Sequence, residues 1–199
     1  MLNNRNLSEL DDQQLVAEYL RGNQAAFEFL VQRHLSPIYN FVFKYVHTVS
    51  DAEDVTQEAF VKIWKNLKKF DKNKKFKTWA FTIAKNTALD LLRRKGLVPF
   101  SQLDSAGSVS GSEIDYDFAA SLVSRAPLPE ARVEQIERLE MIGHAVARLP
   151  EKQQQVVDLY YKQGFNFREI SEILKESINT VKTRHRRAML FLKRHLEDE

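Results

Sequence analysis

The sequence contains no cysteine among its 199 residues. Disulfide bonds, zinc sites with thiolate ligands and cysteine nucleophiles are therefore excluded. Glycine is scarce, with six residues, and none of them form the G-x-G pattern of a phosphate-binding loop. The sequence also lacks an apolar run of about 18 to 20 residues, the length that spans a membrane. Because Met1–Asp12 lacks the pattern of a signal peptide, we expect a soluble cytoplasmic protein without membrane insertion.

Side chains that support catalysis or metal binding are scattered. The five histidines do not form an H-x-x-x-H pair on one helix face. Four carboxylates cluster between Asp51 and Glu58, but no further ligands for a metal ion can be nominated there. We therefore predict a protein that is not an enzyme and that holds neither a metal nor another cofactor.

The charged residues that are present fall into three blocks. Residues 1–100 have 16 Lys and Arg against 11 Asp and Glu, residues 101–140 have 3 against 8, and residues 141–199 have 11 against 8. Two basic blocks on either side of an acidic one indicate a protein that binds an anionic ligand at two places.

Apolar residues recur at three- and four-residue spacing from Leu7 onwards, which predicts helices and almost no strand. This pattern fades between Gly96 and Pro129, where three Gly, three Pro and seven Ser accompany four acidic residues. We therefore predict an all-α protein with an N-terminal helical bundle and a C-terminal helix-turn-helix domain, joined by a flexible acidic linker. The predicted boundaries are 1–96, 97–129 and 130–199.

Two helices are predicted in the second half of the first domain. The segment Ser50–Glu53 has the capping-box pattern, so the first of them is expected to begin with Ser50 as its N-cap. The next helix runs from about Thr78 to Lys95, and Gly96 suits a left-handed residue at its end. The apolar face of the first of these two helices is expected to contain Val55, Ala59, Phe60, Ile63, Trp64 and Leu67.

The stretch Phe60–Phe81 carries eight lysines against one acidic residue, interleaved with six aromatic residues. Lysines bind phosphates and aromatic rings stack with unpaired bases, so single-stranded nucleic acid is one candidate ligand. The alternative is that the rings form the core and the lysines are solvated. In the following helix, Asp90 either contacts nucleic acid itself or orients Arg93 or Arg94 through an ion pair. One polar face of that helix contains Trp79, Thr82, Asn86, Asp90 and Arg93.

The C-terminal segment has the pattern of a helix-turn-helix. Phe167–Leu174 predicts a short helix, Lys175–Ile178 a tight turn, and a longer helix follows from about Asn179. His185 lies on the inward stripe of the longer helix and is expected to pack against the core. The exposed face of that helix is expected to contain Lys182, Thr183, Arg186 and Arg187.

Taken together, these motifs resemble the sigma-70 family of RNA polymerase sigma factors, in the small extracytoplasmic-function (ECF) group. Asp51–Trp64 resembles the polymerase-docking helix, and Phe76–Arg94 resembles the helix that reads and melts the −10 element. Leu149-Pro150, the helix-turn-helix and Thr180–Ala188 resemble the −35-binding domain. The resemblance covers nearly the whole chain except the linker.

The resemblance implies a bacterial alternative sigma factor that binds core RNA polymerase and directs promoter-specific transcription initiation. It further implies recognition of a −35 duplex and a melted −10 strand, and an anti-sigma factor as a partner. The implied polymerase-binding residues are Asp51, Asp54, Gln57 and Glu58. The implied −10 residues are Lys72, Asn73, Lys74, Lys75, Trp79, Asn86 and Arg93, and the implied −35 residues are Lys182, Thr183, Arg186 and Arg187.

Two other classes of protein fit parts of the sequence. A helix-turn-helix regulator that acts without polymerase would use only the C-terminal domain, and leaves the Phe60–Phe81 stretch without a role. A single-strand nucleic-acid-binding protein would use only the first domain, and leaves the helix-turn-helix unexplained.

Overall fold

The computed structural model describes residues 7–97 and 141–197. All regular elements in these two ranges are helical, which confirms the all-α prediction for this part of the chain. A search of the same ranges finds no helix long and apolar enough to span a bilayer. The predicted linker lies outside the described residues, except for Leu97.

The chain divides into two compact units. The first contains α2 (Asp12–Leu20), α3 (Ala25–Val46), α4 (Val49–Asn66), the 3₁₀ turn η1 (Leu67–Lys69) and α5 (Phe76–Arg94). The second contains helical residues 141–147, α7 (Glu151–Val157), the π-helical turn η3 (Asp158–Lys162) and α9 (Ile178–Glu197). A short helix, α8 (Phe167–Leu174), precedes α9, and the segment Arg168–Glu176 is grouped with the first unit.

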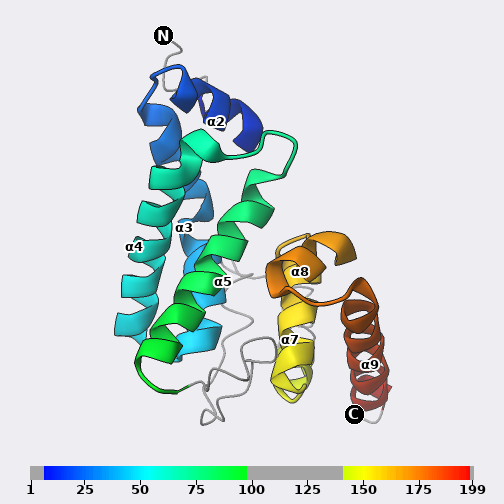
Figure 1. Cartoon of the computed structure of the whole chain (residues 1–199). Helices are drawn as coiled ribbons and strands as arrows, with labels where there is room; N and C mark the ends of the chain where they lie inside the picture. Colours follow the sequence, from blue (N-terminus) through cyan, green and yellow to red (C-terminus); the bar gives the residue numbers. More distant parts are fainter. Residues whose placement is uncertain (1–6, 98–140, 198–199) are drawn as a thin grey trace, which may run out of the picture. The chain divides into compact units, whose positions relative to one another are not determined.

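The first unit is a helical bundle in which α4 packs against both α3 and α5, while α2 lies across one end (Figure 1). Each helix contributes one apolar face to a common core. Phe81 of α5 is fully buried, and its ring centroid lies 5.1 Å from that of Phe41 of α3. The other large side chains that are fully buried in this unit include Leu15, Leu30, Ile38, Ile63, Leu67 and Phe76.

A polar contact holds α2 on the bundle. The carboxylate of Asp12 lies 2.8 Å from Nη1 of Arg33 and 2.8 Å from Nε2 of the buried His34. Burial alone would raise the pKa of Asp12, but the hydrogen bonds and charges of His34 and Arg33 outweigh it and hold the pKa below its ordinary value. The position of α2 matters for the site because its Gln13 supports the lysine-rich loop described below.

The predicted capping box at the start of α4 is wrong by two residues. His47 ends α3 in the left-handed conformation, with φ of 57°, so the extended residue available as a cap is Thr48. The Thr48 hydroxyl accepts a hydrogen bond from the N–H of Asp51 at 3.3 Å, whereas Ser50 already lies inside the helix. The sequence pattern pointed to a cap but could not show where the preceding helix ends.

We expect Thr48→Ala to lower the free energy of unfolding of the first unit by about 1 kcal/mol, because it removes the N-cap of α4. The matched substitution Ser50→Ala should leave this free energy nearly unchanged. Equilibrium urea denaturation followed by tryptophan fluorescence measures both. Equal losses in the two variants would contradict the assignment of Thr48 as the cap.

Helix α5 begins at Phe76, two residues before the predicted start, and ends at Arg94, one residue before the predicted end. Gly96 adopts a φ of +69°, which glycine tolerates without a Cβ clash. The N–H of Leu97 then bonds the carbonyl of Leu92 at 3.0 Å, as in a Schellman end. The chain is thereby turned away directly after three cationic residues, Arg93, Arg94 and Lys95.

The second unit has its own small core. Its buried residues are Ala145, Val146, Leu149, Val157, Ala188 and Leu192. Pro150 precedes α7, and the wide turn η3 ends before Gly164, which has a φ of +69°. In η3 the N–H of Gln163 bonds the carbonyl of Asp158 at 3.0 Å, five residues earlier.

The predicted helix-turn-helix is present. Its first helix has the predicted bounds, and its second begins at Ile178, one residue before the predicted start. Lys175 makes the turn with a φ of +54°. The Ser177 hydroxyl accepts a hydrogen bond from the N–H of Thr180 at 3.0 Å and so caps the second helix.

Candidate nucleic-acid interface

The four predicted polymerase-binding residues lie along α4 but differ in their surroundings. Asp54 and Gln57 are exposed. Asp51 is less exposed, and both of its carboxylate oxygens accept hydrogen bonds from Nζ of Lys95, each at 2.7 Å. Glu58 is also engaged, with cations of α4 and α5. The predicted docking face therefore contains two exposed residues and two that already form ion pairs.

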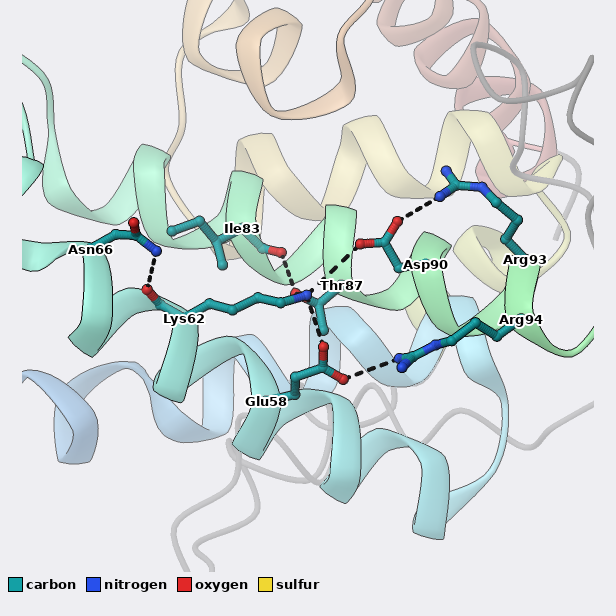
Figure 2. Close-up of polar contacts among 8 residues, drawn as sticks. All are labelled: Glu58, Lys62, Asn66, Ile83, Thr87, Asp90, Arg93 and Arg94. Atoms are coloured by element: carbon teal, nitrogen blue, oxygen red, sulfur yellow. Dashed lines mark hydrogen bonds and ion pairs between the residues drawn. The ribbon is translucent and has the colours of Figure 1, made fainter.

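Glu58 belongs to a polar network that joins α4 to α5 (Figure 2). Its carboxylate lies 2.9 Å from Nζ of Lys62 and 3.1 Å from Nη2 of Arg94. The same ammonium group of Lys62 donates to the hydroxyl of Thr87 at 3.2 Å and lies 3.8 Å from the carboxylate of Asp90. Lys62 thus links the two helices and is not simply a solvated surface lysine.

These contacts lower the pKa of two of the carboxyl groups of α4, those of Asp51 and Glu58. The hydrogen bond from Lys95 is the main reason that the pKa of Asp51 lies below its ordinary value. The pKa of Glu58 is lowered mainly by the hydrogen bond from Lys62, with a smaller effect of Arg94.

The predicted lysine-rich loop, residues 71–75, is a tight turn. Oδ1 of Asp71 accepts hydrogen bonds from the backbone N–H of Asn73 at 3.0 Å and from its side-chain amide at 3.1 Å. The N–H of Lys74 bonds the carbonyl of Asp71 at 2.9 Å, and Gln13 of α2 donates to the carbonyl of Lys74. The exposed side chains on this turn are those of Lys72, Lys74 and Lys75, together with Asp71 and Asn73.

The aromatic residues near this loop belong mostly to the core. Four of them are buried, as expected if the rings form the core and do not stack with bases: Phe60, Phe70, Phe76 and Phe81. Trp79 is half-buried, and its ring centroid lies 5.0 Å from that of Phe70. Trp79, the one aromatic residue among the predicted −10 contacts, therefore combines a ring packed against Phe70 with a partly accessible side chain.

Trp64, which was predicted on the apolar face of α4, is not buried there. Its side chain is 51% exposed, as is that of Val61, at 47%. The two lie at the edge of the apolar stripe and line a shallow cavity of about 280 Å³ together with Phe27 and Phe60. Helical spacing places a residue on a face, but it does not show how far a neighbouring helix covers that face.

The polar face of α5 is formed as predicted, but its arginine is occupied. Trp79, Asn86 and Arg93 are all half-buried along this face. Nη1 of Arg93 donates to the carboxylate of Asp90 at 2.7 Å, which is the ion pair that the sequence left as an alternative (Figure 2). Thr82 donates to the carbonyl of Thr78, one turn earlier.

The predicted −35 residues share one exposed face of α9. The opposite face is buried through Val181, Ala188 and Leu192, which form the predicted inward stripe. All four predicted residues are exposed: Lys182, Thr183, Arg186 and Arg187. Because the second helix of a helix-turn-helix can enter the major groove, this arrangement suits contact with duplex DNA.

His185 packs among aromatic rings, as predicted. Its ring centroid lies 4.9 Å from Tyr160, 5.7 Å from Tyr161 and 5.1 Å from Phe167. Burial lowers its pKa below the ordinary value, so the imidazole is neutral at physiological pH. Within residues 7–97 and 141–197, no group of three or more His, Asp or Glu residues is arranged to hold a metal ion.

Sequence reasoning missed the engagement of Arg94 and Lys95. The pair Glu58–Lys62 has i, i+4 spacing, which a helical pattern in the sequence can indicate. The pairs Arg94–Glu58 and Lys95–Asp51 join residues 36 and 44 positions apart, so no local pattern indicates them.

Two family models match the chain. The model described as Sigma-70 region 2 matches residues 30–97, which include most of α3 and all of α4 and α5. The model described as Sigma-70, region 4 matches residues 139–192, which include α7, α8 and most of α9.

Several curated proteins match over almost their full length. The ECF RNA polymerase sigma factor SigW of Bacillus subtilis (strain 168) is 34% identical over 183 residues, covering 92% of this chain and 95% of that protein. The ECF RNA polymerase sigma-E factor of Escherichia coli (strain K12) is 31% identical, covering 90% and 91%. The RNA polymerase sigma-H factor of Pseudomonas aeruginosa is 28% identical, covering 92% of each.

Two solved structures share the fold, each with a TM-score of 0.58. One is CnrH in complex with the cytosolic domain of CnrY, with 24% identity and coverage of 94% of this chain and 98% of that chain. The other is the sigma factor RpoE in complex with the anti-sigma factor NepR from Bartonella quintana, with 22% identity and coverage of 86% and 96%. Since a relative 34% identical matches nearly all of both chains, this chain belongs to the ECF group of the sigma-70 family, the factors that direct RNA polymerase to promoters.

Proposed function

We propose that this chain binds core RNA polymerase through α4, reads a −35 duplex with α9, and holds the melted −10 strand with the 71–75 loop and α5. The observation that carries the proposal is the exposed cationic face of α9 on one unit, together with the exposed lysine turn on the other. Two separate cationic surfaces fit a promoter with two elements, one duplex and one single-stranded.

Each surface suits its proposed ligand in a different way. On α9, Arg186 and Arg187 have the geometry to reach base edges or phosphates in a major groove. Near α5, lysines 72, 74 and 75 supply phosphate contacts, while Trp79 and Asn86 lie where an unpaired base could stack and be hydrogen-bonded. Asp54 and Gln57 supply the exposed part of the docking face.

The proposed domains are 1–96 for docking and −10 recognition, and 130–199 for −35 recognition, with 97–129 as the acidic linker. The chain would supply specificity and strand stabilisation and catalyse no reaction itself. Its site of action would be the bacterial cytoplasm, where core polymerase is present. An anti-sigma protein is a further proposed partner, supported by the structure of RpoE bound to NepR.

Run-off transcription tests this function. Core RNA polymerase is incubated with a pooled library of promoter fragments, with and without the purified chain, and discrete new transcripts should require both proteins. The variant Asp54→Lys should reduce their yield because it reverses an exposed charge on the docking face. The matched control Glu53→Lys reverses a neighbouring exposed charge and should retain more transcript.

Other outcomes favour the other two classes of protein. If polymerase is unaffected while the free chain still binds duplex DNA with sequence preference, the chain is a helix-turn-helix regulator. If it binds single strands only, the single-strand-binding interpretation holds.

A further inference from the structure

The last turn of α5 carries three consecutive cations, and each one is paired with a carboxylate. Arg93 is bound by Asp90 of the same helix. Arg94 and Lys95 are instead bound by acidic residues of α4: Glu58 at 3.1 Å and Asp51 at 2.7 Å. Two of the three cations at the end of the helix proposed to read the −10 element are thus neutralised by a different helix.

The two α4 carboxylates are also members of the proposed polymerase-binding set. Asp51 and Glu58 therefore have two competing roles, since a carboxylate that pairs with a cation of polymerase is less available to Arg94 or Lys95. The pairs are accessible to competition: the side chain of Arg94 is 60% exposed and that of Lys95 is 44% exposed. Exposed ion pairs contribute little net stability because water screens them, so a partner of similar charge can replace them.

We propose that Arg94 and Lys95 form a phosphate-binding pair for promoter DNA, which Asp51 and Glu58 neutralise until core polymerase engages these carboxylates. This inference rests on the proposed function and concerns the regulation of the same surface. It makes polymerase docking and DNA contact mutually reinforcing: docking releases two cations beside the −10-reading face. We therefore expect the free chain to bind DNA less tightly than the basic charge of its first hundred residues suggests.

Free cations beside DNA have a measurable signature. Each phosphate contact adds about 0.9 to the slope of log K against log salt concentration for duplex DNA, because counterions are released. Two released side chains should therefore steepen the slope by up to about 1.8.

The first test uses the full chain without polymerase and a fluorescein-labelled duplex of mixed sequence, titrated by anisotropy over a salt series. We expect the isosteric double variant Asp51→Asn/Glu58→Gln to bind more tightly than the unmodified chain and with a steeper salt slope. Adding Arg94→Gln/Lys95→Gln to it should cancel the gain. The control Glu28→Gln/Glu53→Gln removes the same charge from exposed residues of the same unit. The gain in DNA affinity of this control should be smaller, and adding Arg94→Gln/Lys95→Gln should not cancel it.

The second test uses the complex with core polymerase on a promoter obtained by run-off transcription. Here Arg94→Gln and Lys95→Gln should each lower the salt slope by about 0.9, a larger decrease than the same substitutions cause in the free chain. The proposal is overturned if Asp51→Asn/Glu58→Gln gains no more than the charge-matched control, or if its gain survives Arg94→Gln/Lys95→Gln. A lack of polymerase-dependent transcripts would contradict the proposed function instead, and the free-chain test would still decide whether the carboxylates mask the two cations.

Discussion

Replacing Phe81 by alanine is expected to lower the free energy of unfolding of the first unit by about 3–5 kcal/mol, the usual cost of removing a buried aromatic ring. The side chain is fully buried on α5 and faces Phe41 of α3, with ring centroids 5.1 Å apart. Its loss leaves a cavity between the helix proposed to bind the −10 strand and the rest of the bundle. Such a loss is a large part of the stability of a small helical unit.

Urea denaturation followed by tryptophan fluorescence measures this effect cleanly. The sequence has two tryptophans, Trp64 and Trp79, and both lie in the first unit, so the signal reports that unit. Val61→Ala, at a 47% exposed position of α4, is the control and should change the free energy by less than about 0.5 kcal/mol. A loss below about 1 kcal/mol for Phe81→Ala would contradict the packing of α5 against α3 described here.

The second large effect is expected at Arg186, on the exposed face of α9. If its guanidinium reads a base edge, Arg186→Ala should weaken binding to the −35 duplex by about 1–3 kcal/mol and relax specificity at one position. Arginine is suited to this role because its planar group can donate two parallel hydrogen bonds to guanine. A lysine that meets only phosphate would lower affinity about equally for all sequences.

Anisotropy with labelled duplexes separates these possibilities. The polymerase complex is titrated with a matched −35 duplex and with a scrambled one, and the ratio of the two affinities is the readout. Arg194→Ala removes the same side chain type from an exposed site two turns further along α9 and should leave this ratio unchanged. If Arg186→Ala also leaves it unchanged, Arg186 does not read sequence.

The sequence was sufficient for features set by local periodicity. The all-α class, the left-handed end of α5 at Gly96 and the first helix of the helix-turn-helix all followed from spacing and turn chemistry. The inward position of His185 followed from the apolar stripe around it.

Features set by the packing of one helix on another were beyond the sequence. The cap of α4 depended on where α3 stops, so Thr48 was missed in favour of Ser50. The exposure of Trp64 depended on how much of α4 its neighbours cover. The pairing of Arg94 and Lys95 depended on the crossing of α4 and α5, which no spacing within either helix encodes.

The wide turn η3 has a consequence for comparing this chain with its relatives. A π-helical turn accommodates one residue more than an α-helical turn, and each residue of an α-helix rotates the chain by about 100°. A relative with a regular helix in place of Asp158–Lys162 would need one residue fewer before its helix-turn-helix. An alignment drawn through this segment without a gap would then shift the positions equivalent to Lys182 and Arg186 by one. It would assign promoter-reading roles to residues on the wrong face of the helix.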